Sequence, residues 1–589
     1  MRTLTLGVLL VAVCILVSCR GAAPAPTPTP PAAPRPTPTP QVAALPTPTA
    51  TPTPRPIIAP PTPTPIGAVP TPTPTPVPAE RPRRGGILNW VDYADPARLD
   101  VHGESPLSVQ QVVAGIHSGL IQYDPRDPFK IVPDLAERWE VSRDGVEYTF
   151  FLRRGVQWHD GRPFTAADVK MSLDRVVGKL DPNFRSPRCG AMLTPLVEET
   201  SIVDDYTVKV RLKFPTLVFI PSVASAWCRI LPKHILERDG NFLEPKSQIG
   251  TGPFKFKRYE RSIVVEWERN DNYYDRELPY LDGVRQYILV GLPTQVAAIK
   301  TGRVHLAPST WPGFTKSQAQ EIRRVRGADV EMWQWPINTI AAVQVNARKA
   351  PFDNRDLRRA VFLAVDRQAI VEKVWEGSGV PCAILPPNLY GEYALPLEEV
   401  LQSPGCRQPK DADIAEARRL VAKHYPQGLD IEVAVRQVGD YLDRVQLVVP
   451  QLAAIGIRGT IRVFESAAGF AYFGRGEHTL IGAQDTAMVL AEPYSVYAAQ
   501  FSVGGGQNFS GWRDDTVERL IGEALRELDP KKRVAIFHEL QRYLLNQDAP
   551  HAIVGWLEGW FVRDRRVRGY KPAPTVYDNN TFMTVWLAE

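Results

Sequence analysis

After its first twenty residues, this sequence of 589 residues has no apolar stretch long and uninterrupted enough to cross a membrane. It has no Cys-x-x-Cys pair, which argues against a zinc or thiol redox site. Gly-x-Ser-x-Gly and His-Glu-x-x-His motifs are missing, and no Lys-Ser/Thr follows the glycines at 504–506. We therefore expect neither an enzyme nor a bound metal or cofactor.

The charge of the chain is nearly balanced. The formal net charge is +5, and no long basic stripe accompanies it, so we expect no nucleic-acid partner. Hydrophobic residues make up 44% and charged residues 23%, as in ordinary globular proteins. The length exceeds what a single hydrophobic core holds, which predicts at least two lobes or domains.

The first twenty residues have the pattern of an export signal. Arg2 provides a positive start, residues 4–17 form a short apolar run, and Leu-Val-Ser-Cys at 16–19 closes it. We interpret 1–19 as a lipoprotein signal peptide with lipid attached to Cys19. This predicts an exported protein anchored on the outer face of the cytoplasmic membrane. A secretory signal cut elsewhere, with Cys19 incidental, is the alternative.

Proline is abundant and unevenly placed. The chain has 57 prolines, and low-complexity Thr-Pro repeats such as 71–76 dominate residues 20–78. Proline fixes φ and removes a hydrogen-bond donor, and the segment has little apolar surface to bury, so no core can form there. We expect 20–84 to be a disordered tether between the anchor and a folded body.

Cysteine usage fits an oxidising compartment. Cys14 leaves with the signal and Cys19 takes the lipid, so four cysteines remain and three pairings are possible. The most local pairing, which we predict, joins Cys189 to Cys228 and Cys382 to Cys406.

From residue 85 onward, strand and helix patterns alternate. Residues 146–152 are β-branched and aromatic and follow an Asp-Gly turn, which predicts a strand. Thr165 with Asp168 predicts a capped helix start. Helical apolar spacing occurs at 366–375, 412–424, 516–528 and 531–545. Interleaved elements of this kind indicate an α/β fold.

Three segments in the first half of the body form a recognisable series: 132–145 (VPDLAERWEVSRDG), 148–155 (YTFFLRRG) and 159–169 (HDGRPFTAADV). Others are 116–120, 250–255, 270–274, 279–282, 298–302, 351–355, 364–367 and 567–570. With these segments, residues 85–570 resemble the bacterial family 5 extracellular solute-binding proteins, the oligopeptide, dipeptide and nickel-binding group.

The resemblance implies a two-lobed periplasmic-binding-protein-like fold, type II and of the large peptide-binding class, with a hinge between the lobes. The first lobe would comprise 85–291, with a subdomain at about 116–198, and 550–589 would return to it. The second lobe would be 292–549. A ligand that contacts both lobes favours the closed state by its extra affinity for it.

The resemblance also implies a function. The chain would be the substrate-binding lipoprotein of an ABC importer, a monomer that passes its solute to the permease subunits. A lipid-anchored sensor or adhesion protein that keeps the fold without transport is the alternative.

One position bears on the ligand. In peptide-binding relatives, an aspartate shortly before an acidic-proline pair holds the peptide α-ammonium. Here the pair is Glu492-Pro493, and the corresponding residue is Val489, which cannot accept a proton. The nearest acid, Asp485, lies four residues earlier and would need a bulged loop to replace it. We therefore expect weak binding of free peptides, and a modified peptide, an oligosaccharide or another polar metabolite as ligand.

Binding sites of this kind combine aromatic faces with a few polar groups. The candidate contacts near this loop are Asp485, Thr486, Val489, Gln507, Asn508 and Trp512. Tyr93, Asn346 and Arg436 are weaker candidates, since core packing or surface charge equally explains them. The His159-Asp160 pair precedes a helix, and we interpret it as structural.

Overall fold

The computed structural model describes residues 81–96, 98–104, 106–307, 313–490, 492–546, 551–572, 575 and 581–589. The chain divides into two compact units, Met1–Pro78 and Ala79–Glu589, and only the second is described. The predicted signal peptide, the lipid site Cys19 and residues 20–80 of the predicted tether therefore lie outside the described residues.

One mixed sheet extends through both lobes of the second unit. In spatial order its strands are β15 (Ile457–Phe464), β14 (Leu429–Arg436), β16 (Leu480–Ala487), β12 (Val330–Val345), β17 (His551–Asp564), β11 (Leu306–Ala307), β1 (Ile87–Asp92), β10 (Gly283–Ile288), β9 (Val264–Arg269) and β8 (Phe254–Glu260), with β13 (Gly379–Pro381) on β17.

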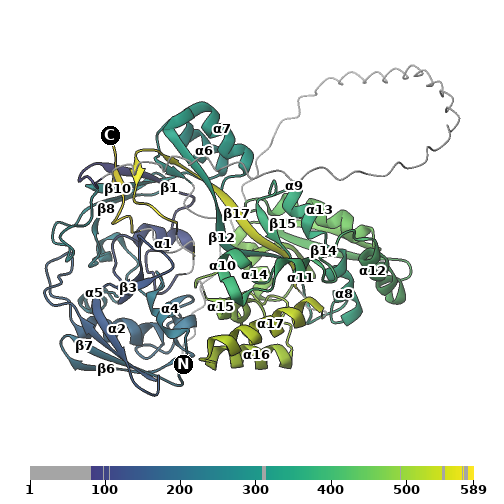
Figure 1. The fold of residues 1–589 in the computed structure, drawn as a ribbon, viewed down its shortest axis with the longest axis horizontal. Helices are drawn as coiled ribbons and strands as arrows, with labels where there is room; N and C mark the ends of the chain where they lie inside the picture. The colour runs from purple at the N-terminus through teal and green to yellow at the C-terminus, as the bar shows by residue number, and fades with distance from the viewer. Residues whose placement is uncertain are drawn as a thin grey trace, which may run out of the picture. The chain divides into compact units, whose positions relative to one another are not determined.

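The long strands β12 and β17 connect the lobes. They run antiparallel, from the Val330–Asp564 pair to the Gln344–His551 pair, and lie side by side in Figure 1. At one end β17 pairs with β11, which adjoins β1 of the first lobe. At the other end β12 pairs with β16 of the second lobe. Any movement of one lobe against the other therefore passes through this pair.

The first lobe adds a four-stranded antiparallel sheet, a hairpin and short helices. The sheet has the order β4 (Ala136–Val141), β5 (Glu147–Leu152), β7 (Thr207–Leu212) and β6 (Val197–Asp204), and the hairpin is β2 (Ile121–Tyr123) with β3 (Ile131–Pro133). The helices are α1 (Leu107–Val113), α2 (Ala166–Val176), α3 (Cys189–Leu193), α4 (Phe219–Ala224) and α5 (Lys233–Asp239). Buried side chains such as Trp90, Phe150 and Trp227 form its hydrophobic core.

The predicted strand at 146–152 and the capped start at Thr165 are confirmed by β5 and α2. The Asp168 carboxylate accepts the Thr165 N–H over 3.0 Å and the Lys233 N–H over 2.9 Å. It therefore caps α2 and also ties the start of α5 to it.

His159 has a structural role. Its Nδ1 accepts the Gly250 N–H over 3.2 Å, and its Nε2 lies 3.1 Å from the Gly252 carbonyl. A Cβ at Gly250 would lie 1.8 Å from the Ile116 carbonyl oxygen, so only glycine fits there. The backbone of the family-like segment 250–255 thus packs closely against that of Ile116, and His159 holds the segment in this position.

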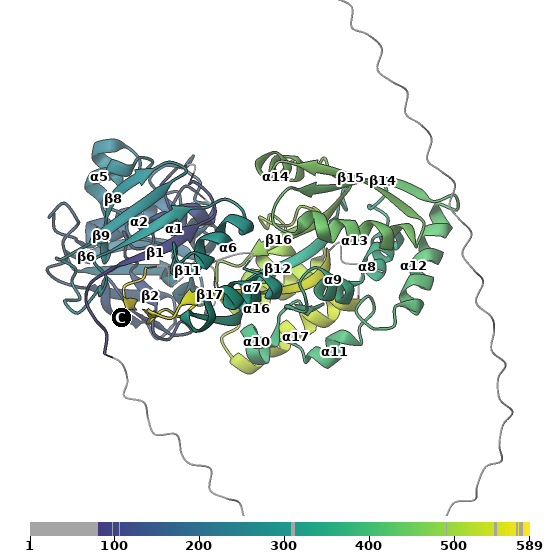
Figure 2. The ribbon, with the colours of Figure 1, turned by 90° about the horizontal axis from the view of Figure 1, so that it is seen from above.

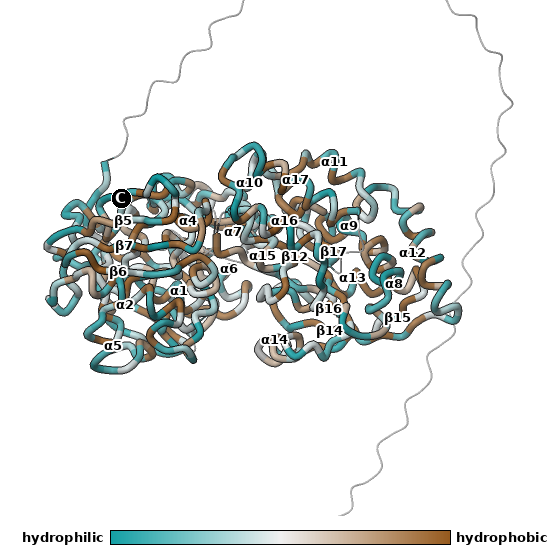
Figure 3. Tube along the Cα trace, turned by 90° about the horizontal axis from the view of Figure 1, so that it is seen from below, coloured by the Kyte–Doolittle hydropathy of each residue, from teal (hydrophilic) through white to brown (hydrophobic). Residues whose placement is uncertain are grey.

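The second lobe packs helices around its part of the sheet. They are α8 (Arg355–Ala364), α9 (Arg367–Lys373), α10 (Pro387–Tyr390), α11 (Leu397–Leu401), α12 (Asp411–His424), α13 (Tyr441–Ala453), α14 (Ser466–Gly474), α15 (Pro493–Gln500), α16 (Asp515–Arg526) and α17 (Pro530–Asn546). The helices predicted at 366–375, 412–424, 516–528 and 531–545 correspond to α9, α12, α16 and α17, and α16 lies beside α17 in Figure 1. Brown and teal stretches alternate along the chain in Figure 3, as amphipathic elements require.

Helices α6 (Leu292–Lys300) and α7 (Lys316–Arg326) lie next to each other in Figures 1 and 2. They share a hydrophobic cluster with Val91 of β1 and Val562 of β17. Short strands β18 (Val567–Arg568) and β19 (Trp586–Leu587) pair near the C-terminus. The lobe limits at 291/292 and 549/550 stay predictions.

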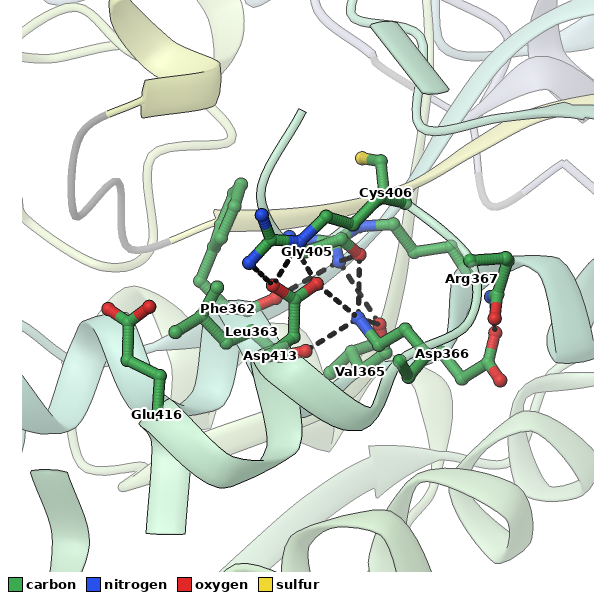
Figure 4. A network of polar contacts seen from close by, with 12 residues as sticks. Phe362, Leu363, Val365, Asp366, Arg367, Gly405, Cys406, Asp413 and Glu416 are labelled. Carbon is green, nitrogen blue, oxygen red and sulfur yellow. Dashed lines mark hydrogen bonds and ion pairs between the residues drawn. The ribbon is translucent and has the colours of Figure 1, made fainter. Parts of the chain in front are cut away.

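A buried polar network holds the 401–413 segment against β17 (Figure 4). The Arg367 guanidinium donates to the carbonyls of Phe362, Val365 and Gly405 and, over 2.8 Å, to that of Ile553. The Asp413 carboxylate accepts the Gly405 N–H over 2.8 Å. Burial lowers the pKa of Lys410, which donates to the Gly405 carbonyl, to about 8.

The structure contains the disulfides Cys189–Cys228, in the first lobe, and Cys382–Cys406, in the second. The paired cysteines are 39 and 24 positions apart in the sequence. Within the described residues, no helix is both long and apolar enough to cross a membrane.

Candidate functional site

The lobes touch at the residues that follow β16. The Ser225 hydroxyl donates to the Val489 carbonyl over 3.5 Å, and Leu490 is buried in the core of the first lobe. In a second contact, the Thr216 hydroxyl donates to the Leu525 carbonyl over 2.7 Å. We call these five residues the inter-lobe junction. A solute held between the lobes beside β16 would lie next to it.

The side chains of β16 divide between two faces of the sheet, because successive residues of a strand point to opposite sides. On one face, the Thr486 hydroxyl donates to the Gln507 side-chain oxygen over 3.3 Å, and the Gln484 amide lies 3.5 Å from the same atom. Asp485 points to the other face, toward α13. Asp485 and Thr486, neighbours in the sequence, therefore do not form one patch.

Asp485 is engaged in a buried ion cluster. Its Oδ1 accepts from Arg444 Nη1 over 2.7 Å, and Arg444 Nη2 donates to Asp440 Oδ1 over 3.0 Å. The side chains of Arg444 and Asp485 are 1% and 4% exposed, so water does little to screen the pair. Burial opposes the charge on Arg444, but the two carboxylates outweigh it and raise the pKa of Arg444.

Asp485 lies in the paired end of β16, just after a register shift between Ile481 and Gln484. Its N–H donates to the Tyr441 hydroxyl over 2.8 Å, and the residue pairs with Ala341 of β12 inside the sheet. The bulged loop that would carry its carboxylate to the position of Val489 is not present, and the carboxylate is held by Arg444. Asp485 is therefore a structural anion in this structure.

Arg436 ends β14 and is buried. It donates to the Ser466 hydroxyl over 2.8 Å and to the Tyr441 hydroxyl over 3.3 Å. Its guanidinium stacks 3.7 Å from the centroid of Phe470, a ring that is 40% exposed. Arg436 thus provides a fixed positive charge at the last paired position of β14, opposite Phe464 of β15 and behind a partly exposed aromatic ring.

Three other predicted contacts have internal partners. Asn346 donates to the carbonyls of Gly476 and His478, over 2.8 and 2.9 Å. Asn508 donates to the Trp512 carbonyl over 2.9 Å, and the Trp512 ring is buried in a core cluster of the second lobe. These side chains hold loops together.

Tyr93 follows β1 and is half-buried against the first-lobe core. Its N–H donates to the Asp92 carboxylate over 2.7 Å. Burial raises the pKa of Asp92 to about 8, so this carboxyl is largely protonated at neutral pH. Sequence patterns missed Asp92 because an acid at a strand end is usually solvated.

The sequence interpretation also missed Arg444, Asp440, Gln484 and Ser225. The Asp440–Arg444 spacing of four residues on a helix is a recognisable ion-pair signal. The contacts of Ser225 and Gln484 join segments far apart in the chain, and no local pattern predicts them. Within the described residues, no group of three or more His, Cys, Asp or Glu side chains is placed to hold a metal ion.

Two lobes, joined by a pair of long antiparallel strands and meeting beside a polar strand end, define a solute-binding protein of the periplasmic class. Residues 130–508 match the model of the bacterial extracellular solute-binding proteins, family 5 Middle. The chain belongs to this family, the exported solute-binding proteins of ABC transporters.

The comparisons with individual proteins agree with the family. The chain is 26% identical over 524 residues to the probable di/tripeptide-binding protein 5 of Pseudomonas aeruginosa, covering 84% of this chain and 94% of that protein. It is 27% identical to the glutathione-binding protein GsiB of Salmonella choleraesuis, covering 75% and 84%. The fold matches DppA of Helicobacter pylori, solved with the peptide STSA, with a TM-score of 0.73 at 24% identity over 86% of this chain and 99% of that one.

Proposed function

We propose that this chain is the lipid-anchored receptor of an ABC importer and captures a peptide-like or other polar solute between its lobes, beside the end of β16. Family membership supports the receptor role. The names of a di/tripeptide-binding and a glutathione-binding relative support a peptide-like ligand. Thr486, Gln507 and the partly exposed face of Phe470 are the polar and aromatic contacts we assign.

The class of ligand depends on whether the site can hold the charged amino end of a peptide. Val489 has no acceptor in its side chain, and the nearest acid along the strand, Asp485, is paired with Arg444 at 2.7 Å. That pairing is the observation that carries the proposal. Burying an ammonium without a charged partner costs several kcal/mol. A ligand whose amino end is blocked or neutral avoids that penalty.

Calorimetry tests this with matched peptides. The purified protein is titrated with a tetrapeptide that has a free amino end and with its N-acetyl form. We expect the acetylated peptide to bind at least as tightly as the free one. Submicromolar binding of the free peptide, about tenfold or more tighter than the acetylated one, would contradict the proposal.

Two variants at one position sharpen the test. Val489→Asp introduces a carboxylate, and we expect it to favour the free peptide by about tenfold or more, roughly 1.4 kcal/mol. Val489→Asn is the control, because it adds polarity and similar volume without charge and should leave the preference unchanged. Equal preference in both variants would show that the amino end lies elsewhere.

A further inference from the structure

A pocket of about 470 Å³ lies in the first lobe, and none of its lining residues belongs to the inter-lobe junction. Its walls come from the β2–β3 hairpin, the 273–278 segment, Arg153 and Met583, and no residue of the second lobe lines it. We call it the β2–β3 pocket. Its volume is in the range of sites that hold small ligands, roughly 300–1,000 Å³.

One wall is fixed by buried hydrogen bonds. The Tyr274 hydroxyl donates to Asp134, and the Tyr273 hydroxyl lies 3.0 Å from that of Tyr274. Asp134 is buried and also accepts the Gly119 N–H over 2.8 Å. The tyrosine rings pack together, with centroids 4.3 Å apart. The pocket thus has a preformed aromatic wall, to which Leu278 and Met583 add apolar surface.

Three guanidinium groups line the same space: Arg126, Arg153 and Arg276. Arg153 uses Nε to donate to the Asp134 carbonyl over 2.6 Å, and its guanidinium carbon Cζ lies 5.2 Å from the centroid of the Tyr274 ring. Within the described residues, neither the terminal nitrogens of Arg153 nor the Arg126 guanidinium has a hydrogen-bond partner. These donors are available to a ligand.

The acids of the pocket do not cancel this charge. Asp124 Oδ1 accepts the Arg126 N–H over 2.8 Å, and Asp275 Oδ1 accepts the Glu277 N–H over 3.1 Å. Each carboxylate therefore has one oxygen turned to its own backbone. Three arginines against two aspartates leave one excess positive charge. Planar guanidinium groups bind carboxylate and phosphate groups through paired hydrogen bonds.

We propose that the β2–β3 pocket is a second ligand site, which binds a small organic anion: a carboxylate or phosphate on an apolar body about the size of one ring. The arginines take the oxyanion, and the body packs on Tyr273, Tyr274 and Met583. This site is independent of the solute held between the lobes.

Calorimetry on the full chain tests the proposal with four probes: phenyl phosphate, benzoate, inorganic phosphate and benzyl alcohol. We expect one molecule of phenyl phosphate or benzoate to bind per chain. Inorganic phosphate, which lacks the apolar body, and benzyl alcohol, which lacks the charge, should each bind at least about tenfold more weakly. The stronger of the first two probes identifies the preferred oxyanion.

A charge-reversal pair localises the binding. Arg126→Glu should weaken the binding of phenyl phosphate and benzoate about tenfold or more, because it replaces a hydrogen-bond donor with a carboxylate that repels the anion. Arg143→Glu makes the same change at an exposed arginine outside the pocket and should have no effect. Both residues are exposed, so both variants should fold, which circular dichroism verifies.

Two results would overturn the site: no saturable binding of either aromatic anion to the wild type, or equal weakening by the two variants. Binding of the N-acetyl peptide is measured in the same samples. Arg126→Glu should leave it unchanged, so failure of the β2–β3 pocket and failure of the proposed transport ligand are told apart.

Discussion

Arg444 neutralises two acidic side chains of the second lobe, Asp440 and Asp485. It is buried between Asp440 and Asp485, and the Trp375 indole N–H donates to the other oxygen of Asp440 over 2.7 Å. Removing one partner of a buried ion pair leaves an uncompensated charge, which is more damaging than losing the pair as a whole.

We expect Arg444→Met to lower the free energy of unfolding by about 3–5 kcal/mol, measured by urea denaturation. The double variant Arg444→Met/Asp485→Asn should recover part of the loss, because the buried charge is gone. Arg462→Met is the control. Arg462 is half-exposed and pairs with Glu432, so its loss should cost about 0–1 kcal/mol. Similar losses in both single variants would refute the special role of Arg444.

His117 makes a pH-dependent contribution to the free energy of unfolding. Its Nε2 lies 3.1 Å from the Gln248 side-chain oxygen, and burial lowers the pKa of His117 from 6.5 to about 4. The unfolded chain therefore takes up a proton below about pH 6.5 while the folded chain does not, so this residue makes stability fall as the pH falls from 6.5 toward 4.

Comparison with a variant isolates this contribution from the other titrating groups. Between about pH 8 and pH 5, the wild type should lose about 2 kcal/mol more stability than His117→Gln. This difference in pH dependence does not depend on how far the stabilities of the two proteins differ at about pH 8. Urea unfolding at both pH values provides the measurement. Parallel pH profiles would mean that His117 titrates normally in the folded state.

At the scale of the element, the contact between the 250–255 segment and Ile116 is decided by glycine. We expect Gly250→Ala to destabilise the protein by about 1–3 kcal/mol or more, because its Cβ would overlap the backbone of Ile116. Gly474→Ala, where nothing lies within 4 Å of the added Cβ, should not destabilise it. Thermal melts of the two variants compare them, and equal melting temperatures would contradict the packing argument.

The elements themselves were predictable where the signal is local. The apolar spacing of α12 and α16, the Thr165 cap and the β-branched run of β5 lie within single segments of the sequence. Strand β16 shows the limit. Its residues 485 and 486 were grouped as contacts, but the alternation of side chains along the strand separates them once the neighbours of the strand are known.

At the scale of the whole molecule, the Thr-Pro segment is predicted to be dispensable for folding. A chain that begins at Arg81 should melt at nearly the same temperature as one that begins at Arg20, because the intervening residues have little apolar surface to bury. Differential scanning calorimetry compares the two. A drop of many degrees in the shorter chain would show that the segment packs on the body.

The anchor is a separate prediction. Expressed in a bacterium that processes lipoproteins, the mature chain should begin at an acylated Cys19, and Cys19→Ala should release it from the membrane fraction. Mass spectrometry of the N-terminal peptide checks this. An unmodified N-terminus beyond Cys19 would instead favour a simple secretory signal.

The sequence alone determined the class of this protein, because export signals, helix caps, glycine contacts and family segments are encoded by neighbouring residues. Local patterns could not predict the inter-lobe junction, the Asp440–Arg444–Asp485 cluster or the β2–β3 pocket. Ser225 and Val489 are 264 positions apart, and Gln122 and Met583 lie at nearly opposite ends of the body. Only the tertiary structure decides such contacts, since charge, burial and access at one residue depend on which distant segments the chain brings beside it.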